Sequence, residues 1–214
     1  MKTSVALLAF LFLTLPLTAD NPQALTATLD ATHVTVGLRP GSQIVLLGVT
    51  LQVERNMLTR RQFSELLTDD DGDGTVTFAP LGGVAFRSIW VAVDLNSGAN
   101  VVAAPEEFEL TNETIASADL QLDANNLIAG LEQHRRSVEL LVVRPGDGAW
   151  ILRATDGGAL DQDQLRNGQL TIAFADAQPL DSSFTSAPST LRGADVVISF
   201  DPVKLQVRTL AVGN

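Results

Sequence analysis

Residues 87–95 read Arg-Ser-Ile-Trp-Val-Ala-Val-Asp-Leu, an alternating, β-branched stretch that is typical of a β-strand. Because successive side chains of a strand point to opposite faces, Ile89, Val91 and Val93 share one face and Trp90 lies on the other. The face of Trp90 also carries serine and aspartate, so we expect it to be the wetter of the two. Trp90 is therefore a candidate platform for a sugar ring or a partner protein. The alternative is that Trp90 packs under a loop or into a domain interface.

Similar short segments, separated by Gly, Pro, Asn and Asp, recur along most of the chain. The candidate strands are residues 25–29, 33–38, 43–53, 75–78, 87–95, 100–104, 107–110, 119–122, 137–143, 149–153, 169–174, 195–200 and 203–210. This spacing predicts an all-β fold built from antiparallel β-sandwiches, with turn signals every ~8–12 residues. One short helix is expected around residues 59–67, where Thr59 is a possible cap and apolar residues follow at helical spacing, and a weaker helical turn at 161–165.

The two halves of the chain carry similar segments in the same order. Residues 36–41 resemble 142–146, residues 74–78 resemble 168–172, and residues 89–94 resemble 196–201. We interpret this as a tandem duplication, and the alternative is chance similarity among β-rich segments. The predicted modules are residues 20–104 and 118–214, joined by a linker at 105–117. In outline they resemble the immunoglobulin-like and fibronectin-like modules of exported proteins, a resemblance that implies architecture only.

Residues 1–19 have the layout of a secretory signal peptide. Lys2 is followed by an apolar run from Val5 to Leu17, and Ala19 then precedes Asp20. The run is shorter than the roughly 17–25 residues of a bilayer span, which disfavours the alternative of an uncleaved membrane anchor. We therefore expect cleavage after Ala19 and a secreted or periplasmic mature protein, with no integral membrane segment. A bacterial source fits the absence of cysteine.

The composition is acidic. The chain has 25 Asp and Glu residues against 14 Lys and Arg, a formal net charge of −11. Such a chain is repelled by phosphate backbones and anionic lipid and attracts cations, so we expect no nucleic-acid partner and no binding to anionic membrane surfaces. Because cysteine is absent, neither a disulfide framework nor a thiolate nucleophile is possible.

The sharpest chemical pattern lies at residues 69–76, which read Asp-Asp-Asp-Gly-Asp-Gly-Thr-Val. Asp69, Asp71 and Asp73 alternate, and a glycine follows at the sixth position. This pattern resembles the D-x-D-x-D-G first half of the calcium loop in EF-hand, dockerin and thrombospondin type-3 proteins. The resemblance implies carboxylate ligands from Asp69, Asp71 and Asp73 and a backbone oxygen ligand from Thr75.

The resemblance to the calcium loop ends after residue 76. The twelfth position, where a bidentate glutamate belongs in an EF-hand, is Pro80. We therefore expect the remaining ligands to come from elsewhere in the fold or from water, with a dissociation constant of ~10⁻⁴–10⁻³ M and a structural role for calcium. The alternative is a solvated acidic turn without an ion.

Recognisable catalytic patterns are missing from the sequence. The only histidines, His33 and His134, lack a metal-ligand spacing, and no nucleophile elbow, P-loop or dinucleotide fingerprint occurs. We therefore expect an exported non-catalytic protein for binding, adhesion or structural support, whose partner is an unknown protein or glycan at the cell surface. The alternative is a secreted carboxylate-dependent hydrolase acting on glycans. A third possibility is a subunit that docks an edge strand into a larger envelope assembly.

Overall fold

A computed structural model describes residues 24–54, 57–84, 87–104, 120–122, 126–130, 137–201 and 206–210, and these form an almost entirely β fold. The strands of the first half are β1 (Thr26–Leu29), β2 (Val34–Gly37), β3 (Gln43–Glu54), β4 (Met57–Thr68), β5 (Thr75–Phe78), β6 (Arg87–Asp94) and β7 (Asn100–Ala103). Those of the second half are β8 (Leu120–Leu122), β9 (Asn126–Gly130), β10 (Ser137–Arg144), β11 (Gly148–Thr155), β12 (Gln169–Ala173), β13 (Gln178–Pro179), β14 (Val196–Asp201) and β15 (Gln206–Leu210), with a short 3-10 helix at Phe174–Asp176. The predicted all-β class is confirmed.

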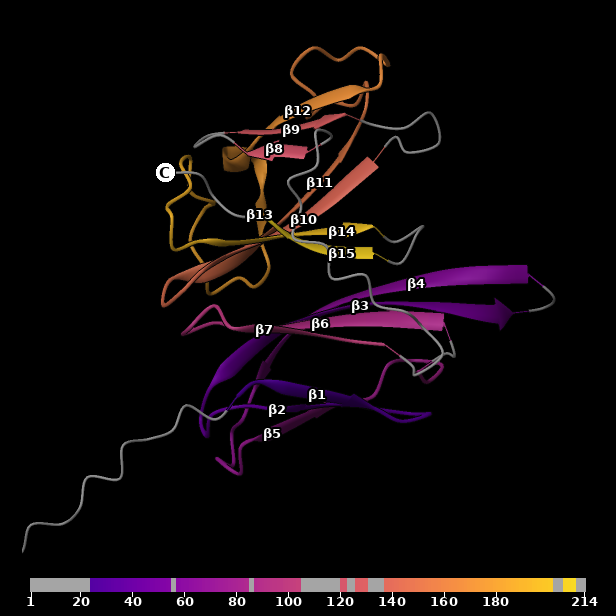
Figure 1. Cartoon of the computed structure of the whole chain (residues 1–214), viewed down its shortest axis with the longest axis vertical. Coiled ribbons are helices and arrows are strands. Elements are labelled where there is room, and N and C mark those ends of the chain that lie inside the picture. Colours follow the sequence, from indigo (N-terminus) through magenta and orange to yellow (C-terminus); the bar gives the residue numbers. More distant parts are fainter. Residues whose placement is uncertain are drawn as a thin grey trace, which may run out of the picture.

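The strands form four antiparallel sheets that stack as layers (Figure 1). The first half supplies a three-stranded sheet of order β1-β2-β5 and a four-stranded sheet of order β4-β3-β6-β7. The second half supplies a five-stranded sheet of order β13-β11-β10-β14-β15 and a three-stranded sheet of order β12-β9-β8. The two larger sheets lie in the middle of the stack, and each three-stranded sheet covers the outer face of one of them.

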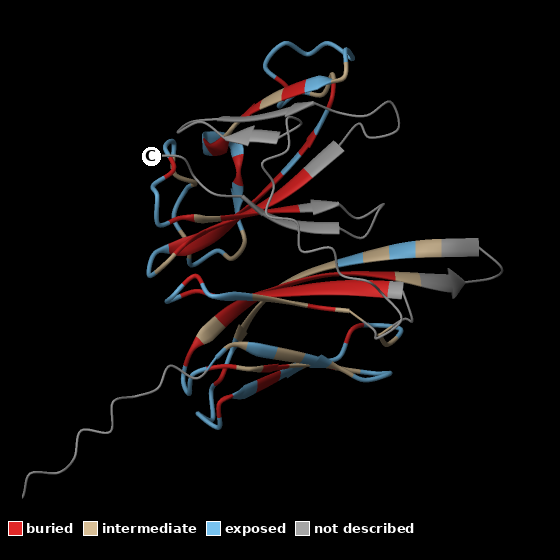
Figure 2. Ribbon diagram, viewed as in Figure 1, coloured by how far each residue is buried: buried red, intermediate tan, exposed pale blue. Residues whose placement is uncertain are grey.

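Three apolar cores fill the spaces between the four layers. On β3, Val45, Leu47 and Val49 face the second half, whereas Ile44 and Leu46 face the β1-β2-β5 sheet. All five side chains are buried, and Figure 2 shows buried residues concentrated in the strands of the middle sheets. A strand covered on both faces carries a nearly continuous apolar run, which explains the composition of β3.

The core between the two middle sheets joins the halves of the chain. It contains Val45, Leu47, Val91 and Val93 from the first half and Leu141, Val143, Ala149, Ile151 and Ile198 from the second. At one end of this core the backbone N–H of Gly146 donates to the carbonyl of Leu95 at 2.9 Å. The halves therefore share a buried interface, which the sequence analysis does not predict.

The predicted helix at residues 59–67 is wrong. That segment belongs to β4, which pairs with β3 from Met57–Glu54 to Thr68–Gln43. Phe63 and Leu67 pack toward the β1-β2-β5 sheet, while Leu66 packs toward the second half. The apolar spacing fits a helix as well as a two-faced strand, and pairing with β3 decides between them.

Three other expectations differ from the structure or fall outside it. Residues 161–165 form a hydrogen-bonded turn, in which Gln164 donates to the Asp161 carbonyl at 3.2 Å, and the positive φ of Gln164 prevents a helix from continuing. Besides β4, the strands β9 and β13 have no counterpart among the predicted strands. The predicted strand at 107–110 and the linker at 105–117 lie outside the described residues.

The two halves repeat one order of strand pairing. The order β4-β3-β6-β7 matches β11-β10-β14-β15, and β1-β2-β5 matches β8-β9-β12. The similar segments at 74–78 and 168–172 include the equivalent strands β5 and β12, and those at 89–94 and 196–201 lie on the equivalent β6 and β14. These matched orders support the tandem duplication, which stays a prediction.

The resemblance of residues 36–41 to 142–146 predicts that the Arg-Pro-Gly turns at 39–41 and 144–146 are equivalent, and this prediction is wrong. The turn at 39–41 joins β2 to β3, whereas the turn at 144–146 joins β10 to β11, a different place in the strand order. A better match is Leu-Asp-Ala at 29–31 with Leu-Asp-Ala at 122–124, each followed at the same distance by Gly-Leu. This pair spans the equivalent β1–β2 and β8–β9 regions of the sequence.

Candidate metal centre

The acidic loop connects β4, which ends at Thr68, to β5, which begins at Thr75. The ligand atoms of Asp69, Asp71 and Asp73 all lie within 4.8 Å of one another. In the described part of the chain, this is the one group of three or more His or acidic side chains that converge in this way. The structure therefore brings together the three carboxylates that the sequence proposes as calcium ligands.

Asp69 organises the loop. Its side chain is buried, with an exposed fraction of 3%, and accepts backbone N–H groups of Gly72 at 3.1 Å, Gly74 at 3.0 Å and Gly41 at 2.9 Å. These amide donors, that of Gly41 foremost, hold the pKa of the Asp69 carboxyl below its usual value because they stabilise the charged form. Gly72 and Gly74 have φ of 71° and 82°, a left-handed backbone that glycine adopts without strain.

Two hydrogen bonds through Asp69 also fix the loop to the β2–β3 turn. Besides the bond from Gly41 to its carboxylate, the backbone N–H of Asp69 donates to the carbonyl of Ser42 at 3.1 Å. Both connections cross between the two sheets of the first half, because β2 and β5 belong to the three-stranded sheet and β3 and β4 to the four-stranded sheet. An ion bound in the loop would therefore stabilise the connection between both sheets.

Asp71 and Asp73 are exposed and keep most of their acceptor capacity. Asp71 accepts one bond, from the backbone N–H of Asp73 at 3.3 Å. One oxygen of Asp73 accepts the backbone N–H and the hydroxyl of Thr75, both at 2.7 Å. An ionised carboxylate has about four lone-pair sites, so both side chains retain free sites for a cation, and Asp69 retains at most one.

The separation of the carboxylates suits calcium. Calcium–oxygen distances of about 2.3–2.6 Å place ligands on opposite sides of the ion about 4.6–5.2 Å apart. One ligand oxygen from each residue lies within 4.8 Å of the others, a separation that is compatible with a calcium loop. The side chain of Thr75 bonds to Asp73, and the role of its backbone oxygen as a ligand stays a prediction. A hollow of about 520 Å³, lined by residues 66–71 and 75–77, leaves room for water ligands.

The second half contains a counterpart of Asp69. Asp156 directly follows β11, and its carboxylate accepts the backbone N–H of Gly168, just before β12, at 3.1 Å. In the first half, the carboxylate of Asp69 after β4 accepts the N–H of Gly74 before β5 in the same way. Nearby, Asp161 is buried and accepts the backbone N–H groups of Gly157 at 2.9 Å and Thr171 at 3.3 Å. Neither Asp156 nor Asp161 is among the predicted site residues, although the Thr-Asp pairs at 68–69 and 155–156, each at the end of a strand, indicate the equivalence of Asp69 and Asp156.

Trp90 is not an exposed platform. It is fully buried between the two sheets of the first half, where its ring stacks on Phe63 with centroids 5.5 Å apart and meets Phe78 edge-on at 6.0 Å. Around Trp90 the predicted wet face is dry because the β1-β2-β5 sheet covers it, whereas Asp94 at the end of β6 lines a polar cavity. The position of Trp90 also differs from the alternative stated for it, because the residue packs between two sheets of its own half and not under a loop or at a domain interface.

The two histidines contribute nothing to the acidic cluster in the described residues. His33 lies just ahead of β2, and its backbone N–H donates to the Asp30 carboxylate at 2.7 Å in a capped turn. His134 lies outside the described residues. Asp70 is exposed and is not a member of the convergent group.

Comparison of the chain with protein-family models, with curated proteins and with solved structures found no match. Within the described residues, none of the helices has the length and apolar character that a membrane span requires. The assignment of function therefore depends on the fold and the acidic loop.

Proposed function

We propose that this chain is an exported, non-catalytic protein for binding, adhesion or structural support, in which calcium stiffens the first half. The observation that carries the proposal is the convergence of Asp69, Asp71 and Asp73 within 4.8 Å, in a loop hydrogen-bonded to the β2–β3 turn. Calcium neutralises the repulsion among these carboxylates and locks the loop against that turn. A structural ion of this kind suits modules that work in calcium-containing surroundings outside the cytoplasm.

Three described carboxyl groups have the properties expected of structural residues. Where their pKa departs clearly from its usual value, it is lowered: at Asp30 to about 2, by the backbone N–H of Thr32 first, and also at Asp69 and Asp181. A glycoside hydrolase needs one carboxylic acid whose pKa is raised, so that it can protonate the leaving group. At Asp30, Asp69 and Asp181 the hydrogen bonds act in the opposite direction, so none of these three carboxyl groups suits that acid role.

The direct test of the metal proposal is calorimetric titration of the purified chain with calcium and, separately, with magnesium. We expect one calcium site with a dissociation constant of ~10⁻⁴–10⁻³ M and weaker magnesium binding, because magnesium demands a tighter octahedral shell. Asp71→Ala and Asp73→Ala should abolish the signal. Asp163→Ala is the matched control, since Asp163 is also exposed and accepts a backbone N–H two residues ahead, from Leu165 at 2.8 Å. Equal calcium binding by wild type and the Asp71→Ala variant would contradict the proposal.

Export is tested separately from metal binding. The layout of residues 1–19 supports a cleaved signal peptide and a location in the periplasm or the medium. Expression of the full chain in a bacterial host, followed by fractionation and N-terminal sequencing, should yield a mature form starting at Asp20. Recovery of the intact chain with Met1 in the cytosol would contradict export without affecting the calcium proposal.

A further inference from the structure

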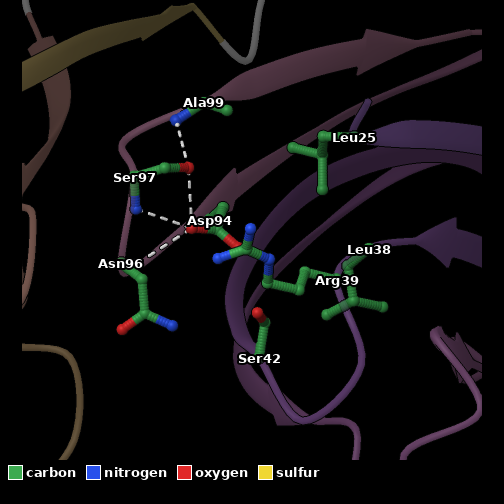
Figure 3. A pocket seen from close by; sticks show the side chains of 8 residues that line it. All are labelled: Leu25, Leu38, Arg39, Ser42, Asp94, Asn96, Ser97 and Ala99. Atoms are coloured by element: carbon green, nitrogen blue, oxygen red, sulfur yellow. Dashed lines mark hydrogen bonds between the residues drawn. The ribbon is translucent and has the colours of Figure 1, made fainter. Parts of the chain in front are cut away.

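A small cavity lies where the β2–β3 turn faces the β6–β7 turn. Its volume is about 270 Å³, and its lining includes Arg39 and Ser42 from the first turn and Asp94 and Asn96 from the second. Leu25 and Leu38 supply apolar wall (Figure 3). The cavity is distinct from the acidic loop, whose hollow is lined by other residues.

The carboxylate of Asp94 is held rigidly at this cavity. The residue is 7% exposed, and its Oδ1 accepts the backbone N–H of Asn96 at 3.0 Å and both the N–H and the hydroxyl of Ser97 at 2.7 and 2.8 Å. The Ser97 hydroxyl in turn accepts the N–H of Ala99 at 3.2 Å. The second carboxylate oxygen of Asp94, Oδ2, accepts no hydrogen bond from the described residues. One oxygen therefore positions the turn while the other is available to a ligand.

Arg39 brings the opposite charge to the same cavity. Figure 3 shows its side chain reaching across from the β2–β3 turn toward the Asp94 end. Among the described residues, the guanidinium makes no ion pair or hydrogen bond, and the side chains of Ser42 and Asn96 likewise have no partner. Two opposite charges thus line one small cavity without forming a direct ion pair, and two neutral polar groups lie beside them.

We propose that this cavity binds a free α-amino acid with a small aliphatic side chain. The α-carboxylate pairs with the guanidinium of Arg39, which presents a planar set of donors that matches a carboxylate. The α-ammonium donates to Oδ2 of Asp94, and Ser42 and Asn96 supply further hydrogen bonds. The aliphatic side chain lies against Leu25 and Leu38. This inference does not rest on the proposed calcium site.

The pairing of charges favours an amino acid over a neutral sugar. A sugar hydroxyl can hydrogen-bond to either group, but a neutral sugar brings no charge to pair with Arg39 or Asp94. A zwitterion compensates both charges at once, and its two charged groups are close enough together to fit a cavity smaller than the roughly 300–1,000 Å³ of a drug-sized pocket.

The test is calorimetric titration of the full mature chain, in one calcium-containing buffer, with L-valine, L-valinamide, N-acetyl-L-valine and glucose. L-Valine should bind saturably at one site at millimolar concentrations or below. Valinamide lacks the carboxylate and N-acetylvaline lacks the ammonium, so each should bind at least about tenfold more weakly, as expected for the loss of one charge-assisted hydrogen bond.

The variant Arg39→Gln isolates the proposed carboxylate contact. Arg39 is exposed and without a partner among the described residues, so the variant should fold and melt like wild type while binding valine at least about tenfold more weakly. Arg192→Gln, an exposed arginine outside the cavity, is the matched control and should bind valine normally. Failure of wild type to bind valine, equal binding of the blocked forms, unchanged binding by Arg39→Gln, or binding of glucose alone would each overturn the proposal.

Discussion

Gly48 is the position where one added methyl group should disturb the fold most. Gly48 lies on β3 directly between Phe63 on β4 and Trp90 on β6. A Cβ atom built at Gly48 would lie 2.1 Å from Cε3 and 2.2 Å from Cζ3 of Trp90. The indole ring occupies the space above the glycine and stacks on Phe63 across it. Gly48→Ala must therefore displace a fully buried tryptophan.

The cost of Gly48→Ala can be worked from three contributions. Overpacking of a well-packed core costs about 1–3 kcal/mol. Partial loss of the aromatic contacts of Trp90 costs about 0.5–1.5 kcal/mol more. The lower chain entropy of alanine in the unfolded state offsets about 0.5–1 kcal/mol. The expected net loss is about 2 kcal/mol, or about 4–8 °C in melting temperature for a chain of this size.

Urea unfolding monitored by circular dichroism measures this loss directly. Gly37→Ala is the matched control, because its added Cβ would lie 2.6 Å from the hydroxyl and 3.9 Å from Cβ of Thr26, so that only one small, exposed side chain has to move. In a Trp90→Leu background, Gly48→Ala should cost at least about 1 kcal/mol less than in the wild type, since the smaller side chain relieves the clash. A Gly48→Ala loss below about 0.5 kcal/mol, or the same loss in the Trp90→Leu background, would refute the reasoning.

Three further predictions concern other parts of the fold. Asp195→Ala should lower the free energy of unfolding in urea by about 3–5 kcal/mol, because buried Arg144 then loses two hydrogen bonds of 2.8 and 2.9 Å to the Asp195 carboxylate. The double variant Arg144→Met, Asp195→Leu should lose less stability, since it leaves no unpaired charge. Leu47→Ala, in the core shared by both halves, should cost about 2–5 kcal/mol while unfolding remains a single transition; two separate transitions would contradict a shared core. Because the pKa of Asp69 is lower in the folded protein, its ionisation stabilises the fold fully above the unfolded-state pKa of 3.8, and this stability is lost as the pH falls through the folded-state pKa. Acid unfolding curves of Asp69→Asn should therefore lack this loss of stability.

Strands that alternate or run continuously apolar could be predicted from the sequence. The bounds predicted for β3, β5 and β6 agree with the structure within one residue, because alternating and β-branched residues in these segments favour a strand over a helix. β4 could not be predicted in this way. Its apolar residues at 63, 66 and 67 suit one face of a helix, and only the pairing with β3 places Leu66 and Leu67 on opposite faces of a sheet.

The predictable part of the candidate metal centre is local in sequence. Asp69, Asp71 and Asp73 lie within five residues, so their convergence follows from one turn of the backbone. The burial of Trp90 depends on a sheet contributed by other segments, and alternation alone cannot show that a polar-looking face is covered. The Arg39–Asp94 cavity joins two turns far apart in sequence, and no local pattern indicates that they meet.

The most direct test of the central claim is a thermal melt of the purified mature chain in excess chelator and then in calcium at ten times its dissociation constant. Binding at that concentration stabilises the native state by RT ln 11, about 1.4 kcal/mol, which corresponds to a rise of about 3–6 °C. Asp71→Ala should lose this rise, and the Asp163→Ala control should retain it. Equal melting temperatures of the wild type with chelator and with calcium would contradict the account and leave the loop an ordinary acidic turn.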